Sequence, residues 1–146
     1  MKEIPILCGA DETKEILLGK KTLRRRIKGL PEGVAEITYI NNEWMLDNGW
    51  IFPIKCPYGK KGDILWAREP FKYENYFQLT DQIHFRFMAG VSKIVTGMEK
   101  YIPARKLGKE IPATHMPRQA SRISLTVQEI NVEQIKDEFY WIITTI

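Results

Sequence analysis

A chain of 146 residues, 44% of them hydrophobic, predicts one compact domain spanning residues 1–146 and excludes an intrinsically disordered protein. The formal net charge is +4, from 22 Lys and Arg against 18 Asp and Glu, which is too small for a basic coat over the whole surface. No stretch reaches the roughly 18 consecutive apolar residues of a membrane span, and the first residues lack a signal-peptide pattern, so we expect a soluble cytoplasmic protein with no membrane partner.

The cysteine and histidine content argues against a metal site and against a disulfide framework. Cys8 and Cys56 are far apart in the sequence and neither lies in a CxxC pair, so we interpret both as free thiols. Together with His84 and His115 they have no spacing that is typical of zinc ligands. We therefore expect no metal and no cofactor.

The N-terminal region predicts a short strand followed by a helix. The strand is expected in KEIPILC, residues 2–8, and the helix in ADETKEILLGK, residues 10–20. Asp11 or Thr13 is a candidate cap for the first turn of this helix, and Gly19 is suited to ending it. The helical side chains expected to face the core are Ile16 and Leu17.

The central region has the composition and alternation of further strands. Strands are expected at residues 34–40 (VAEITYI), 64–68 (ILWAR) and 83–89 (IHFRFMA). In the last of these, Ile83, Phe85 and Phe87 alternate with more polar positions, which predicts one buried face. EWMLDNGWIF, residues 43–52, predicts a hairpin because Asn and Gly tolerate the positive φ angles of tight turns.

The second half of the chain combines an irregular segment with the clearest strand. Residues 90–120 carry Gly and Pro at intervals, which predicts a long irregular loop. Residues 121–135 alternate and predict a strand, whereas FYWIITTI, residues 139–146, fits either a final strand or an apolar tail. The predicted fold class is α+β and mostly β: a barrel or curled sheet with an N-terminal helix.

A strand expected to begin at Lys21 carries the positive excess of the chain. KKTLRRRIK, residues 20–28, holds six basic residues, and without them 16 remain against 18 acidic residues. Such a patch predicts an anion-binding surface, and arginine favours phosphate because its planar fork donates two parallel hydrogen bonds. The candidate binding residues in this segment are Lys20, Lys21, Arg24, Arg25 and Arg26. The alternative is an edge strand whose charges prevent aggregation.

A second candidate site lies in LWAREPF, residues 65–71. Alternation places Trp66 and Arg68 on one face of the strand, and Glu69 on the other face at the strand's end. Glu69 could act as a general acid or base, or could accept a hydrogen bond from the exocyclic amine of a base. The alternative is an ion pair between Glu69 and an arginine from residues 24–26.

Two other features could contribute to ligand binding. In HMPR, residues 115–118, His115 and Arg118 could contact an anion from a loop that two prolines stiffen, although a structural role is the alternative. Aromatic residues that could stack on bases or fill the core are Trp44, Trp50, Trp66, Phe71, Tyr73, Tyr76 and Phe77.

Three blocks of the sequence resemble a known family. Gly19, Lys21 and Arg26 fit the G-x-K-x-x-x-x-R pattern of the ASCH domain, a member of the PUA-like superfamily. CPYGKKGDILWAREPF (56–71) and ATHMPRQASRISLTVQEINVEQI (113–135) resemble stretches of small ASCH-like proteins of bacteriophages and prophages. The resemblance implies a PUA-like β-barrel in a bacterial host cell, with a cleft beside the first helix and the basic strand.

One ASCH branch that resembles the N-terminal block hydrolyses 4-acetylcytidine with a Lys, a Thr and a later Glu. Lys21 matches the Lys, but Arg24 occupies the position of the Thr, so Thr22 is the nearby hydroxyl. Lys21 and Thr22 point to opposite faces of a regular strand, and so do Lys21 and Arg26, so one shared cleft requires an irregular backbone. The C-terminal KDEFYWIITTI departs from the family pattern, although Glu138 lies there.

These observations lead to three functional expectations. The first is a module that binds RNA, single-stranded nucleic acid or a modified nucleotide in a basic cleft. The second is an amidohydrolase that acts on an acylated nucleoside, with Lys21, Thr22 and Glu69 as catalytic residues. The third is a phage morphogenesis or host-factor-binding protein with a phage or host protein as its partner.

Overall fold

The computed structural model describes residues 1–77, 82–96 and 107–146, which are mostly β-strand. Chain contacts divide it into two compact units. Unit 1 comprises residues 1–2, 21–64 and 126–146, and unit 2 comprises residues 3–20 and 65–125. The mostly β prediction is confirmed, and one domain over residues 1–146 stays a prediction. Among the described residues, no helix has both the length and the apolar character that crossing a membrane requires.

Unit 2 begins with strand β1 (Glu3–Leu7) and helix α1 (Ala10–Leu17), as predicted. The expected caps are wrong, because the helix starts after Gly9 and Thr13 lies inside it, where its hydroxyl donates to the Gly9 carbonyl oxygen at 2.9 Å. The prediction that Leu17 faces the core is also wrong, since this side chain is 52% exposed. A helix of two turns buries a narrow stripe, and here the stripe contains Thr13 and Ile16.

Gly19 ends α1 as predicted. Its φ of +106° lies in the left-handed region, which glycine adopts without the steric cost of a Cβ. Its N–H donates to the Ile16 carbonyl oxygen at 2.9 Å and so closes the last turn.

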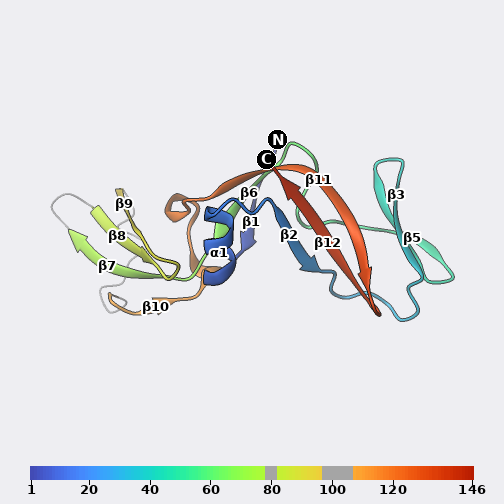
Figure 1. The fold of residues 1–146 in the computed structure, drawn as a ribbon, viewed down its shortest axis with the longest axis horizontal. Coiled ribbons are helices and arrows are strands. Elements are labelled where there is room, and N and C mark those ends of the chain that lie inside the picture. The colour runs from blue at the N-terminus through green and yellow to red at the C-terminus, as the bar shows by residue number, and fades with distance from the viewer. Residues whose placement is uncertain (78–81, 97–106) are drawn as a thin grey trace. The chain divides into compact units, whose positions relative to one another are not determined.

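A four-stranded antiparallel sheet forms most of the remainder of unit 2. Its order is β10 (Glu110–Ile111), β7 (Phe71–Phe77), β8 (Gln82–Phe87) and β9 (Ser92–Thr96), and Figure 1 shows β7, β8 and β9 side by side. The predicted alternation in β8 is confirmed, since Ile83, Phe85 and Phe87 are buried. These three pack with Phe71, Tyr73, Ile111, Met116 and Ala120. Strand β6 (Ile64–Arg68), also predicted, lies next to β1 in a different sheet.

The prediction of an irregular loop over residues 90–120 is wrong for much of its described part. It contains β9, β10 and two short 3₁₀ helices, η3 (Ala113–His115) and η4 (Arg118–Ala120), while residues 97–106 lie outside the described residues. Both 3₁₀ helices begin directly after a proline, Pro112 and Pro117, whose fixed φ suits a helix start. In this segment the prolines therefore mark the starts of short helices and do not indicate a lack of regular structure.

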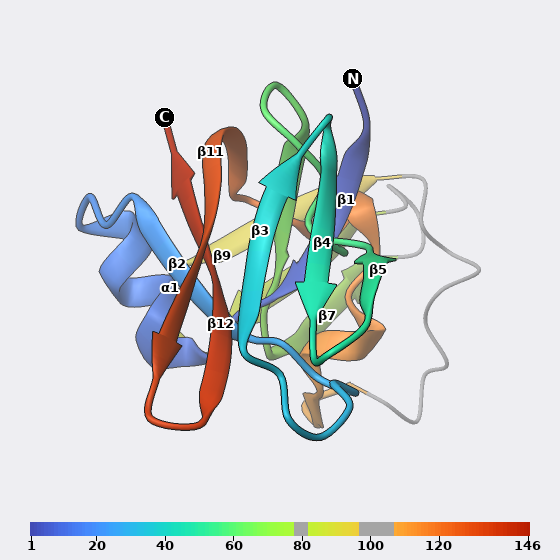
Figure 2. The same cartoon turned by 90° about the vertical axis from the view of Figure 1, so that its right-hand side faces the viewer.

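Unit 1 contains the long antiparallel pair β11 (Ser124–Ile135) and β12 (Glu138–Thr145), with β2 (Thr22–Arg26) beside β12. A second sheet has the order β3 (Glu36–Ile40), β4 (Glu43–Asp47) and β5 (Ile51–Ile54), and Figure 2 shows these three strands in a row. The prediction of β11 is confirmed, and FYWIITTI contributes to a strand rather than a tail. The buried side chains of this unit's core are Ile27, Ile37, Leu46, Phe139 and Trp141.

Two tight turns organise the β3–β4–β5 sheet. The predicted hairpin around Gly49 is confirmed: Asp47 pairs with Ile51, and the φ of Gly49 is +102°. The second turn, at Asn41 and Asn42, was not predicted. Its φ angles are +51° and +65°, as a two-residue hairpin of the type I′ class requires, and asparagine adopts them more readily than most residues.

Candidate functional site

The basic strand β2 is a regular edge strand. It pairs with β12 in unbroken register from Thr22 opposite Thr144 to Arg26 opposite Tyr140. Arg24 and Arg26 are exposed, whereas Leu23, which alternates with them, is buried. Within β2 the register contains no bulge, so the backbone irregularity that a cleft shared by Lys21 and Arg26 requires is not present between residues 22 and 26.

Carboxylates of β12, which pairs with β2, and of β11, the next strand of the sheet, already face two of the arginines of β2. Arg24 Nη2 lies 3.3 Å from Glu133 Oε2, and Arg26 Nη2 lies 3.2 Å from Glu138 Oε1. The Tyr140 hydroxyl donates to Glu138 at 2.7 Å, and this hydrogen bond is the main cause that raises the pKa of Tyr140. Exposed ion pairs of this kind contribute little stability, but they offset the charge of the strand. Their geometry favours the edge-strand interpretation.

The other basic residues of the segment also have contacts. Lys20 Nζ lies 2.9 Å from Glu15 Oε2, which ties it to α1 in unit 2. Arg25 Nη1 donates to the Arg24 carbonyl oxygen at 2.8 Å. Lys21 is exposed, and its carbonyl oxygen accepts hydrogen bonds from Thr145 N at 2.7 Å and Thr145 Oγ1 at 3.1 Å.

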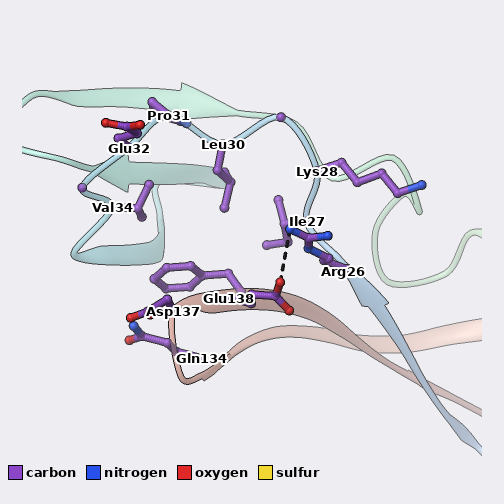
Figure 3. Close-up of a pocket in the computed structure, with 13 residues that line it drawn as sticks. Arg26, Ile27, Lys28, Leu30, Pro31, Glu32, Val34, Gln134, Asp137 and Glu138 are labelled. Atoms are coloured by element: carbon purple, nitrogen blue, oxygen red, sulfur yellow. Dashed lines mark ion pairs between the residues drawn. The ribbon is translucent and has the colours of Figure 1, made fainter.

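A polar pocket lies between the segment after β2 and the turn that joins β11 to β12 (Figure 3). Its volume is about 540 Å³. Its lining carries the cations Arg26 and Lys28 and the carboxylates Glu32, Asp137 and Glu138. Because the acidic groups outnumber the basic ones, this pocket is poorly suited to a phosphate group.

Glu69 lies in a buried ion pair with Arg122. The Glu69 side chain is fully buried, Arg122 Nη2 donates to Oε1 at 2.8 Å, and Arg122 Nε donates to Oε2 at 3.0 Å. Arg122 also donates from Nη1 to the Gly90 carbonyl oxygen at 3.0 Å, and its guanidinium lies 4.1 Å from the Phe87 ring centroid. The expected alternative partner, an arginine from residues 24–26, is therefore wrong. The sequence alone does not single out Arg122, because it is one of several polar positions in the alternating residues 121–135.

Trp66, Arg68 and Arg118, all predicted to bind ligand, do come together in unit 2. The Arg68 guanidinium carbon lies 4.9 Å from the Trp66 ring centroid, and that of Arg118 lies 5.5 Å from it. Trp66 itself is only 6% exposed. Its ring therefore makes cation–π contacts with the two guanidinium groups and is not open for a base to stack on.

A lysine that was not predicted stands beside this group. Lys93 Nζ donates to the carbonyl oxygens of Ser121 at 2.8 Å and Gln119 at 3.1 Å. Its pKa is lowered, first by burial and second by the positive charge of Arg118. We name the set Trp66, Arg68, Lys93 and Arg118 the arginine cluster. Lys93 lies on β9, and recognising this strand in the sequence would have indicated a fixed position for the lysine. The prediction of an irregular loop over residues 90–120 did not include this strand.

The arginine cluster is poorly neutralised. Arg118 Nη2 contacts Glu3 Oε1 at 3.0 Å and Ser124 Oγ at 3.3 Å. Arg68 makes no side-chain hydrogen bond or ion pair with any part of the chain that the structure describes, and the Nε atoms of Arg68 and Arg118 are both buried without a partner. Three cations thus share one carboxylate. This arrangement favours the binding of an anion.

The remaining predicted residue, His115, lies at the end of η3 and is exposed. Within the described ranges, no hydrogen bond or ion pair joins His115 to the arginine cluster, and no three His, Cys, Asp or Glu side chains gather where they could hold a metal ion.

The chain matches no family model, and neither a curated protein nor a solved structure matches it.

Proposed function

We propose that this protein is an ASCH-like, PUA-type nucleic-acid-binding module that binds a phosphate of RNA or single-stranded DNA at the arginine cluster. The mostly β fold with its early helix is compatible with a PUA-type barrel. The sequence resemblance in residues 56–71 and 113–135 supports the same class, because these two blocks contribute Trp66, Arg68 and Arg118 to the cluster.

The observation that carries this proposal is the state of Arg68. A guanidinium is always charged at neutral pH, and a half-buried one without a carboxylate partner is energetically costly. Arg68 is held in this state against Trp66, beside a second arginine that shares the same ring. Because Nε of Arg68 is buried, a phosphate oxygen would accept charge-assisted hydrogen bonds from the terminal Nη groups of this side chain.

The experiment compares the binding of a labelled oligoribonucleotide by the wild type, Arg68→Gln and Arg86→Gln over a salt series. Arg86 is the matched control, because it is 62% exposed and lies 3.7 Å from a carboxylate of Glu74. We expect Arg68→Gln to weaken binding about tenfold and to reduce the salt slope by about 1, whereas Arg86→Gln leaves both unchanged. Equal affinity and slope for the wild type and Arg68→Gln would overturn the proposal.

A further inference from the structure

Unit 1 contains a second groove, which is separate from the polar pocket beside Arg26. It has a volume of about 790 Å³, which is in the usual range for ligand sites. Residues from β3, β4, β5, the following loop and β11 line it, and all of them belong to unit 1. We name it the aromatic groove.

Two aromatic side chains form one wall of the aromatic groove. The rings of Tyr39 and Trp44 lie 4.9 Å apart, and Tyr39 is 53% exposed. Trp44 is fixed from the core side by the buried Trp141, whose ring lies 5.1 Å away in an edge contact. A preorganised and accessible ring pair of this kind suits stacking of an unpaired base.

Three lysines line the same groove. Lys55, Lys60 and Lys61 are exposed, and no carboxylate in residues 1–77, 82–96 or 107–146 lies within ion-pair distance of their ammonium groups. Two carboxylates, Glu43 and Glu129, also line it and are likewise outside any ion pair among these residues. Although the charge of Lys60 contributes to lowering the pKa of the nearby Asp63, no ion pair holds these ammonium groups, which leaves them available to phosphate groups.

Amide side chains complete the groove. Asn42, Gln128 and Asn131 line it and are exposed. Amides donate and accept hydrogen bonds at once, and carboxylates accept from exocyclic amines, so both types can pair with the edge of a base. A base is open at its face and its edge together only when the strand is unpaired.

We infer that the aromatic groove binds single-stranded nucleic acid, with a base stacked on Tyr39 and phosphates at Lys60 and Lys61. This inference deepens the proposed function by naming an unpaired strand as the ligand. It also depends on residues that the arginine cluster does not share, so the two sites can be tested separately.

The experiment measures the binding of a labelled single-stranded oligonucleotide of about eight nucleotides, and of the matching duplex, by fluorescence anisotropy. The variants are Tyr39→Ala and the double variant Lys60→Gln/Lys61→Gln. Trp50→Ala is the matched control, since Trp50 is an 81% exposed aromatic residue between β4 and β5 that does not line the groove. Circular dichroism verifies that each variant is folded.

We expect Tyr39→Ala to weaken single-strand binding about five- to hundredfold, as the loss of one stacking contact does. The lysine double variant is expected to reduce the salt slope by about 1 to 2, Trp50→Ala to have no effect, and the duplex to bind more weakly than the single strand. Unchanged binding by Tyr39→Ala would overturn the inference, as would equal affinity for duplex and single strand. If Arg68→Gln loses binding and Tyr39→Ala does not, the proposed function holds and the inference about the aromatic groove is wrong. If Tyr39→Ala loses binding and Arg68→Gln does not, the aromatic groove is the binding site and the arginine cluster is not.

Protection of Cys56 gives an independent readout. Its thiol is half-buried in the aromatic groove, and a bound oligonucleotide should slow its alkylation. We expect protection by the single strand in the wild type and none in Tyr39→Ala. Alkylation that is equally fast with and without a saturating single strand would contradict the assignment of this groove.

Discussion

Arg122 binds both carboxylate oxygens of Glu69, at 2.8 and 3.0 Å, inside a site where Glu69 has no exposed surface. The geometry is the planar two-bond arrangement that arginine and carboxylate form best. Taking two charges out of water is costly, and their mutual attraction offsets that cost only while both partners are present. The pair should therefore tolerate joint replacement better than the loss of either residue.

We expect Arg122→Leu to lower the free energy of unfolding by about 3–5 kcal/mol, because it leaves an unpaired buried carboxylate. The double variant Glu69→Leu/Arg122→Leu is expected to be more stable than Arg122→Leu alone. Urea unfolding of the wild type, both single variants and the double variant measures the coupling. Additive losses in this cycle would contradict the interpretation.

Asp63 should contribute to the pH dependence of the free energy of unfolding. This buried carboxylate accepts hydrogen bonds from Lys2 N at 2.9 Å and Lys60 N at 3.0 Å, and the first of these is the main cause that lowers its pKa below 3.8. In the interval between the folded and unfolded pKa values the unfolded chain binds more protons, so the stability that Asp63 contributes is complete above this interval and is lost as the pH falls through the folded pKa.

We therefore expect Asp63→Asn to be less stable than the wild type at neutral pH by about 1–3 kcal/mol, since the amide cannot accept both hydrogen bonds equally well. The difference should shrink below about pH 4, where the wild type loses its own contribution. Thermal unfolding from acidic to neutral pH measures both effects. A difference that stays constant over this range would argue against a role for Asp63 ionisation.

Cys56 should react slowly at neutral pH. Burial raises its pKa to about 11, and a backbone hydrogen bond with Tyr58 offsets only part of this. The thiolate is the reactive form, and with this pKa only about one Cys56 side chain in ten thousand is a thiolate at pH 7. We expect alkylation by iodoacetamide, followed by mass spectrometry, to accelerate about tenfold per pH unit between about pH 8 and 10. The Cys56→Ser variant controls for Cys8, which is buried.

The hydrolase alternative predicts turnover of 4-acetylcytidine, and we expect none. Thr22 lies in a regular strand opposite Thr144, and Arg122 holds both oxygens of Glu69, so neither group is arranged to take up or deliver a proton freely. Incubation with 4-acetylcytidine and chromatographic detection of cytidine measures this directly. Turnover that disappears in Lys21→Ala and Thr22→Ala would restore the enzymatic interpretation.

Elements with strong local signals could be predicted from the sequence. The alternation of Ile83, Phe85 and Phe87 indicated β8, and the Asn48-Gly49 pair indicated the β4–β5 hairpin, because both signals arise within a few residues. Strand β9 was missed because its strand character depends on pairing with β8, and Ile94, its central apolar residue, is 55% exposed. The placement of Leu17 failed for a related reason, since only the neighbours of a short helix decide which of two adjacent apolar residues is buried.

The sequence indicated which types of residue form the candidate site, but not which of these residues contact one another. Trp66, Arg68 and Arg118 come from two blocks more than forty residues apart, and only the fold shows that both arginines contact one ring. The run Arg24, Arg25 and Arg26 is a strong sequence signal for anion binding, whereas a single arginine gives none. Its ion pairs with Glu133 and Glu138 depend on the register of β11 and β12, which periodicity does not encode.

The discontinuous build of unit 1 bears on how fast it can form. Strand β2 pairs with β12, and the hydrogen bond from Thr145 to the Lys21 carbonyl joins residues 124 positions apart. Closing such a large loop costs conformational entropy before the contact can stabilise the fold. Domains rich in non-local strand pairs therefore fold in milliseconds to seconds rather than microseconds. The β3–β4 hairpin, whose turn contains two asparagines, can form early because its strands are adjacent in sequence. Strand β2 can pair only after the distant strand β12 has come close to it. Docking of β2 onto β12 is therefore expected to limit the rate at which unit 1 folds.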